Sequence, residues 1–342
     1  MDKISVLVTG IGGGSHGEQI IKSLKLVKNS NLEIIGTDVT HLTTGKKIVD
    51  KFYQVPFASD KKYEDIIFDI IKKNNIKFIF HGSEPELKFL SENRKKFEDI
   101  GIQHPLNSKK IIDVCMNKYE TYKMLDKLGI KLPKFKKINS LDDIEDINFY
   151  PLILKPSVGS GGSSNVHIIL DKFECELFVK YMLKHKIDII AQQYVGKHSD
   201  EYTIGVSSNQ SSDILGSIVV KRHITNALST HNKVKYKDNL YVISSGVSQG
   251  QVCHKKNLQK QAENIARLIK STGPLNIQCR EVGGELLLLE INPRLSGTTS
   301  LRAMAGYNEP YLLIKNKILN LEWDCTYNDI NIMRTIEEIV ID

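Results

Sequence analysis

The 342-residue sequence lacks the features of a secreted, membrane-spanning or zinc-binding protein. It has no apolar run near the roughly 18 residues that a membrane helix needs, and its first residues, MDKISVLVTG, lead into an apolar strand rather than a signal peptide. The five cysteines are odd in number and form no Cys-x-x-Cys pair. We therefore expect reduced thiols, a cytoplasmic location and no zinc site.

A strong charge of one sign is also missing. Lys and Arg number 47 against 40 Asp and Glu, a net charge of +7, and the excess is spread along the chain as pairs such as Lys46-Lys47 and Lys61-Lys62. Scattered lysines are typical of solvated helix surfaces, so we expect no nucleic-acid or membrane partner. A small anionic ligand, such as a nucleotide, accounts for the excess equally well.

Strands and helices alternate through the first 105 residues. Strands are predicted at residues 4–9, 32–36 and 76–80, and helices at about 18–27, 63–73 and 85–97. This alternation indicates an open parallel α/β sheet. We expect a first domain at 1–105 and a second at 106–342.

The pattern after residue 105 is typical of α+β structure. Helices are predicted at 118–128, 173–184 and 257–271, and strands at 152–155, 166–170 and 187–194, with further strands to about 252. No internal repeat and no low-complexity segment is present.

A hairpin near the C-terminus carries the most informative polar residues. Glu290 and Asn292 are two apart, so both side chains lie on one face of a strand, about 7 Å apart. A strict two-residue turn at Gly283-Gly284 sets Gln278 opposite Leu289, away from that face. A three-residue loop or a bulge sets Gln278 opposite Glu290, as a shared ligand would require.

Amide and carboxylate oxygens in this arrangement suit Mg²⁺, which is usually held by one or two carboxylates and substrate phosphates. Gln278, Glu290 and Asn292 are therefore candidate metal ligands, and Arg294 places a guanidinium beside them. The alternative is a buried strand that ends in an ordinary polar turn.

Two glycine loops are candidate phosphate sites. The first, Gly10 to Gly17, follows a strand and precedes a helix, and Asp38 ends the next strand, as in a dinucleotide fingerprint. Ser15 stands where the third glycine is needed. We therefore favour a tight turn lining a substrate cleft over an NAD(P) site.

The second loop, residues 157–164, joins two strands and lacks the Gly-Lys-Ser/Thr of a P-loop. A Gly/Ser hairpin offers backbone amides to phosphates and closes as a lid, although it is also compatible with a plain surface hairpin. Lys155 on the apolar strand before it favours function, because a buried lysine needs an anionic partner.

Four elements in this order resemble the ATP-grasp superfamily, most closely its carbamoyl-phosphate-synthase-like branch. They are the Lys118 helix, Lys155 with its loop, Gln193–Gly196 followed by Glu201, and Gln278 to Arg294. The resemblance covers about residues 3–320. It implies a pre-ATP-grasp domain at 1–105 and two α+β subdomains that clasp ATP. These are a lid at about 120–193, and a metal-binding and substrate subdomain at 194–342.

The resemblance also implies residue roles. Arg294 and Lys155 are the catalytic candidates at the transferred phosphoryl group. Two Mg²⁺ ions, replaceable by Mn²⁺, are held by Gln278, Glu290 and Asn292. The residues implied in ATP binding are Lys118, Lys155, Ser157, Gly159, Ser160, Gly161, Gly162, Ser163, Gln193, Tyr194, Val195, Glu201 and Glu290.

The sequence departs from the family pattern at some positions. Gln193 and Gln278 stand where many members have acids, although Gln278 matches the carbamoyl-phosphate-synthase branch. Because the sequence has a single ATP-grasp module and no glutaminase segment, we do not expect it to make carbamoyl phosphate itself.

The family chemistry implies a carboxylate–amine ligase that forms an amide through an acyl phosphate and releases ADP and phosphate. Its partners are then a small carboxylate and an amine, with a homodimer left open. Candidate substrate residues are Lys221, Arg222, His223, Ser296, Gly297, His16 and Glu84. All but His16 have a plainer interpretation, as a basic strand end, a helix cap or a helix-start acid.

Other functions stay open on the sequence. A carboxylase-like or kinase-like enzyme would activate bicarbonate or another acid without an amine. An NAD(P)-dependent oxidoreductase would use the first loop, and a nucleotide-binding protein without catalysis would have no need of Glu290, Asn292 and Arg294 together. Neither the acid nor the amine can be identified.

Overall fold

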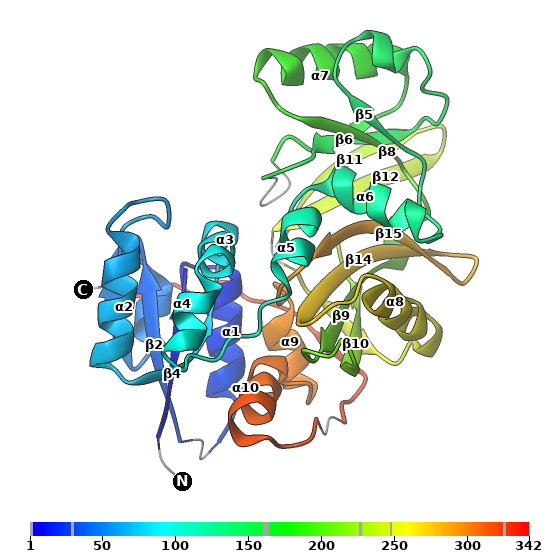
Figure 1. The fold of residues 1–342 in the computed structure, drawn as a ribbon. Coiled ribbons are helices and arrows are strands. Elements are labelled where there is room, and N and C mark those ends of the chain that lie inside the picture. The colour runs from blue at the N-terminus through cyan, green and yellow to red at the C-terminus, as the bar shows by residue number, and fades with distance from the viewer. Residues whose placement is uncertain are drawn as a thin grey trace.

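The computed structural model describes residues 3–28, 31–159, 164–225, 228–246, 248–323 and 326–341. Its N-terminal part, drawn in blue in Figure 1, is a parallel sheet in the order β3-β2-β1-β4. The strands are β1 (Ile4–Thr9), β2 (Leu32–Asp38), β3 (Lys51–Gln54) and β4 (Ile76–Phe80). The helices are α1 (His16–Lys25), α2 (Tyr63–Lys73), α3 (Glu84–Glu92) and α4 (Arg94–Asp99), with a 3-10 turn η1 (Thr44–Lys47).

The predicted parallel sheet is confirmed, with two differences in its elements. β3 was missed because its four residues, KFYQ, are partly exposed and carry no apolar run. The helix predicted at 85–97 is two helices that meet at Asn93, whose side chain donates a hydrogen bond to the Phe89 carbonyl at the end of α3.

Two helices, α5 (Lys109–Cys115) and α6 (Lys118–Lys127), lead to an antiparallel sheet in the order β5-β8-β6-β7. Its strands are β5 (Phe135–Ile138), β6 (Leu152–Pro156), β7 (His167–Ile169) and β8 (Ile189–Gln193). Helix α7 (Lys172–Lys184) packs on one face of this sheet, with Val179 and Met182 in the shared core, and η2 (Asp142–Ile144) lies in the β5–β6 connection. We call this unit the upper sheet, after its place in Figure 1.

A larger antiparallel sheet follows in the order β15-β14-β9-β10-β13-β16. Its strands are β9 (Glu201–Ser208), β10 (Ile214–Arg222), β13 (Gly250–Cys253), β14 (Pro274–Val282), β15 (Glu285–Asn292) and β16 (Ile330–Ile332), preceded by η4 (His198–Asp200). Helix α8 (Lys256–Leu268) packs on this sheet through Leu258 and Ile265. The β11 (Ser229–Tyr236) and β12 (Asn239–Gly246) hairpin lies beside β7 of the upper sheet.

Helices α9 (Thr299–Met304) and α10 (Glu309–Leu319) return the chain to the N-terminal part. Leu313 and Ile314 of α10 pack with Val6, Ile20 and Phe80 in one core cluster, and Figure 1 shows α9 and α10 beside α1. This packing brings the C-terminal edge of the parallel sheet close to the end of β15.

The β14–β15 hairpin has the register that sets Gln278 opposite Glu290. Gly283 and Gly284 have φ values of +59° and +83°, which suit a two-residue turn. Val282 pairs with Glu285, and an irregularity at Leu289 then sets Gln278 opposite Glu290. Of the two solutions that the sequence allowed, the hairpin uses the bulge.

Among the described residues, no helix is both long and apolar enough to cross a membrane.

Candidate active site

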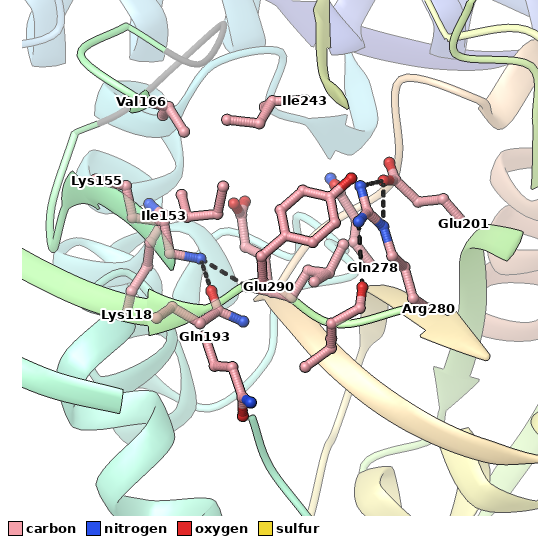
Figure 2. A pocket seen from close by; sticks show the side chains of 14 residues that line it. Lys118, Ile153, Lys155, Val166, Gln193, Glu201, Ile243, Gln278, Arg280 and Glu290 are labelled. Carbon is pink, nitrogen blue, oxygen red and sulfur yellow. Dashed lines mark hydrogen bonds and ion pairs between the residues drawn. The ribbon is translucent and has the colours of Figure 1, made fainter. Parts of the chain in front are cut away.

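A cleft lies between the upper sheet and the β14–β15 hairpin. Its volume, including the part open to solvent, is about 670 Å³. Figure 2 shows Lys155 on one side, the Arg280–Glu201 pair on the other and Glu290 between them. The lining residues are Lys118, Ile153, Lys155, Val166, Gln192, Gln193, Tyr194, Val195, Glu201, Ile243, Gln278, Arg280, Leu289 and Glu290.

The cleft has a cationic end at Lys155. This lysine follows the buried Leu154 on β6 and is itself only 6% exposed. Its Nζ donates to the Gln192 side-chain oxygen and, at 2.9 Å, to the Leu289 carbonyl. Burial, helped by the nearby Lys118 charge and opposed by Glu290, lowers the pKa of Lys155 to about 7.

We expect this low pKa to make nucleotide binding pH-dependent. A bound phosphate favours the ammonium form, so affinity is highest below the Lys155 pKa of about 7 and falls as the pH rises above it. Between pH 6.5 and 8 the protonated fraction, and with it the ADP affinity, should drop about tenfold. Calorimetric titration of ADP across this range is the measurement.

The matched control is Lys155→Arg, because arginine stays protonated throughout this range. It corrects for titration of the nucleotide itself and should flatten the dependence. Equal pH profiles for the wild type and Lys155→Arg would contradict titration of Lys155 as the cause of the pH dependence.

Glu290 lies at the centre of the predicted metal ligands. The Asn292 side-chain amide donates to Glu290 Oε1 at 2.6 Å, and Gln278 faces Glu290 across the hairpin. Burial pushes the pKa of Glu290 upward, but the charges of Lys118 and Lys155, the Asn292 amide and the Arg294 charge outweigh burial and lower it. A carboxylate that stays ionised in a buried position is suited to a divalent cation.

A second, smaller chamber adjoins the cleft and shares Lys118 and Glu290 with it; its volume of about 330 Å³ includes space open to solvent. Arg294 forms one wall, only 8% exposed. Its NH2 group lies 3.7 Å from Glu84 Oε1 and donates to Asn292 Oδ1 at 3.3 Å, while its buried Nε has no hydrogen-bond partner among the described groups. Leu87, Cys115 and Met116 add an apolar side.

Two histidines from the N-terminal part lie near Arg294. Burial, with the Arg294 charge second, lowers the pKa of His16 well below its usual value, and the same causes lower the pKa of His81 to about 3. Both imidazoles are therefore neutral at pH 7. His16 and Glu84 were candidates from the sequence, whereas His81 was not, although it directly follows β4 at the same sheet edge.

The opposite end of the cleft is built around Glu201, whose carboxylate is held by two arginines. Arg222 NH1 donates to Oε1 at 2.7 Å, and Arg280 NH2 and Nε donate to Oε2 at 3.0 and 3.2 Å. Arg280 also donates to the Val195 and Val242 carbonyls and lies 4.3 Å from the Tyr194 ring centroid.

Arg280 is a site residue that the sequence analysis missed. It is two residues from Gln278 on β14, so the period-two rule that selected Glu290 with Asn292 places Arg280 on the same face. Arg222, by contrast, was proposed for a substrate carboxylate and is engaged by Glu201.

The predicted adenine residues lie at the end of β8 and directly after it. Tyr194 donates its backbone amide to the Pro151 carbonyl, and its hydroxyl bonds to the Val242 backbone. The Gln193 side-chain oxygen accepts a hydrogen bond from the Lys134 amide at 3.3 Å. The apolar side chains of Ile153, Val166, Ile243 and Leu289 line the space beside this segment.

Other predicted residues lie apart from this centre or have local partners. Lys221 Nζ lies 3.9 Å from Asp200, and His223 contacts the Asn331 side chain at 3.2 Å. The Ser296 hydroxyl accepts from the Thr298 amide as a local cap, and the Gly297 carbonyl accepts from Arg334.

The two glycine loops differ in what the structure describes. In the second, Ser157 and Gly159 are described, and Gly159 lines the second chamber; Ser160, Gly161, Gly162 and Ser163 lie outside the described residues. In the first, the Gly14 amide before α1 donates to the chain's own Glu18 carboxylate. That carboxylate lies where a dinucleotide phosphate would bind.

Two sequence families match parts of the chain. Residues 7–105 match the family described as the PylC-like N-terminal domain, and residues 237–337 match the family described as ATP-grasp in the biosynthetic pathway with Ter operon. Solved structures match nearly the whole chain. The L-amino acid ligase of Bacillus licheniformis superposes with a TM-score of 0.63 over 96% of this chain and 76% of that one, at 18% identity.

The chain has the ATP-grasp fold. Another ATP-grasp structure, the ADP complex of the N5-carboxyaminoimidazole ribonucleotide synthetase purK, gives a TM-score of 0.67 over 96% of this chain and 80% of that one, at 14% identity. The predicted fold class and the predicted resemblance are therefore confirmed.

Curated relatives extend the ATP-grasp comparison at the level of sequence. An uncharacterized protein of Methanocaldococcus jannaschii is 32% identical over 215 residues, 62% of this chain and 49% of the relative. The carbamoyl phosphate synthase large chain of Buchnera aphidicola is 24% identical over 278 residues, 80% of this chain and 23% of the relative. The chain therefore spans about half or less of the length of these relatives.

Proposed function

We propose that this ATP-grasp chain is an ATP-dependent carboxylate–amine ligase. It binds MgATP in the cleft, phosphorylates a small carboxylate in the second chamber, and passes the acyl group to an amine. The observation that carries the proposal is the shared boundary of the two spaces. Lys118 and Glu290 line both, so a phosphoryl group bound by Lys118, and by a cation that Glu290 would hold, faces both the nucleotide and the acid.

ATP fits the cleft by charge and by shape. Lys118 and Lys155 supply cations for the phosphates, the apolar side chains of Ile153, Val166, Ile243 and Leu289 supply a slot for the base, and Glu201 supplies an acceptor for ribose hydroxyls. We propose that the described part of the loop, Ser157 and Gly159, contacts the phosphates. We extend this role to the segment Ser160 to Ser163.

The ligands Gln278, Glu290 and Asn292 fit Mg²⁺. They offer one carboxylate of lowered pKa and two side-chain amide oxygens, leaving room for phosphate oxygens and water. When bound, the cation neutralises charge on the β- and γ-phosphates. We propose two such ions, with Mn²⁺ as a substitute.

The reaction balances without a protein nucleophile. A carboxylate oxygen attacks the γ-phosphorus, the bond to the bridging oxygen of ADP breaks, and an acyl phosphate forms. The amine nitrogen then attacks the acyl carbon, inorganic phosphate leaves with the former carboxylate oxygen, and the nitrogen loses a proton. Arg294 stabilises the charge on the transferred group.

The proposal is tested by ADP release from MgATP against pooled carboxylates, with hydroxylamine as the trapping nucleophile. The expected result is ADP formation that depends on an acid, together with a hydroxamate that mass spectrometry identifies. ADP release with bicarbonate but without a hydroxamate would favour the carboxylase-like alternative. No ADP release with any acid, although ATP binds, would contradict the proposed reaction.

The setting of this reaction is also part of the proposal. The four described cysteines are free thiols, and a cytoplasm would supply both reducing conditions and ATP. We propose small-molecule substrates there.

A further inference from the structure

The bulge at Leu289 decides which face of β15 carries Glu290. Before the bulge, Leu286 and Leu288 point into the core that contains Cys279, and beyond it Ile291 does so. A regular ladder would set Glu290 opposite the buried Ile277 and turn its side chain toward that core. The extra residue turns Glu290 to the cleft.

A bulge leaves backbone groups without ladder partners, and buried carbonyls need donors from elsewhere. The Tyr122 hydroxyl donates to the Leu288 carbonyl at 2.7 Å and lies 3.2 Å from the Leu289 carbonyl. Gln192 Nε2 donates to the Leu288 carbonyl at 3.0 Å, and Lys155 Nζ donates to the Leu289 carbonyl at 2.9 Å. Three side-chain donors thus serve the two carbonyls of the bulge, and the single hydroxyl proton of Tyr122 lies within reach of both.

These donors differ in how firmly they are held. Tyr122 is 1% exposed on α6, and its ring packs edge-on against Phe135 with centroids 5.0 Å apart. Gln192 and Lys155 belong to the upper sheet, and Lys155 is the side chain that the proposed function assigns to ATP phosphates. When Lys155 turns to a phosphate, Tyr122 is left as a donor for the Leu289 carbonyl.

We propose that Tyr122 is a positioning residue whose hydroxyl holds the Leu288–Leu289 bulge and thereby aims Glu290 at the metal. Tyr122 does not touch the nucleotide in this role. The inference rests on the proposed function because that function names Mg²⁺ with a nucleotide as the ligand of Glu290.

The test is Mn²⁺ binding in the presence of ADP, followed by electron paramagnetic resonance, with no turnover required. Tyr122→Phe keeps the ring and removes the hydroxyl. We expect Mn²⁺ affinity to fall about 10- to 100-fold, as for other groups that orient a metal ligand, with metal-free ADP affinity unchanged. Tyr119→Phe is the matched control, because Tyr119 lies on the same helix and contacts the same Phe135 ring.

Two further variants keep the test decisive. Gln192→Met removes the other donor to the Leu288 carbonyl and should weaken Mn²⁺ binding in the same direction. In a Glu290→Gln background, Tyr122→Phe should cause no further loss, because the residue it positions has already lost its charge.

The outcomes separate positioning from folding and from the reaction. Unchanged Mn²⁺ affinity in folded Tyr122→Phe, or an equal further loss in the Glu290→Gln background, would overturn the proposal. So would a wild-type protein that binds no Mn²⁺ with ADP, which would remove the metal site as well. The wild type could also form no ADP with any acid tested. If Tyr122→Phe then lost Mn²⁺ binding selectively, the positioning role would be supported and only the proposed reaction would be contradicted.

Discussion

Replacement of Glu290 by glutamine is expected to reduce acid-dependent ADP formation about a thousandfold or more. Glu290 supplies the carboxylate in a set whose other members, Gln278 and Asn292, are amides, and it faces both the cleft and the second chamber. A metal ion contributes several kcal/mol to the stabilisation of transition-state charge, and a thousandfold loss corresponds to about 4 kcal/mol. Glutamine preserves the shape of the side chain, so the fold should persist.

The control is Glu285→Gln, the same change at an exposed position on the same strand. It should leave turnover within about twofold of wild type, because substitutions at exposed positions away from a site usually have small effects on the protein. Steady-state ADP assays and thermal melting on both variants provide the comparison. Full activity in Glu290→Gln would refute the assignment of Glu290 as a metal ligand.

The second large effect is expected at Arg294. Arg294→Lys keeps a positive charge but loses the planar fork that contacts Asn292 and faces Glu84. A misplaced donor to the transferred phosphoryl group costs about 100- to 1,000-fold in kcat. Because Arg294 lines the second chamber rather than the nucleotide cleft, the affinity for ATP should change little.

Measurement of kcat beside an independent ATP dissociation constant distinguishes the two roles. Arg267→Lys, on the exposed surface of α8, makes the same exchange away from the site and should behave as wild type. If Arg294→Lys instead lost ATP binding and kept kcat, Arg294 would belong to the nucleotide site and not to phosphoryl transfer.

The local features of this site followed from the sequence because they depend on spacing along one strand. The two-residue spacing of Glu290 and Asn292 placed both on one face, and the demand that Gln278 share their ligand required a longer loop or a bulge. The choice between these could not be made, because a bulge at Leu289 is stabilised by Tyr122, Gln192 and Lys155, which are distant in the sequence.

Features that arise from contacts between distant segments were not predictable in this way. Arg280 could have been selected by its spacing from Gln278, but its partners Glu201 and Val242 meet only in the folded chain. His81 joins Arg294 because α10 packs against the N-terminal sheet. The second chamber is lined by residues of α3, α5 and the end of β15. No periodicity in the sequence predicts that these three elements lie side by side.

The most direct test of the account follows the oxygen atom of the acid. The carboxylate found by hydroxamate trapping is labelled with ¹⁸O and incubated with MgATP and its amine, and the released inorganic phosphate is analysed by mass spectrometry. Attack of the carboxylate on the γ-phosphorus predicts one ¹⁸O atom in each phosphate. Unlabelled phosphate, formed at the same rate as ADP, would contradict activation of the acid by phosphorylation.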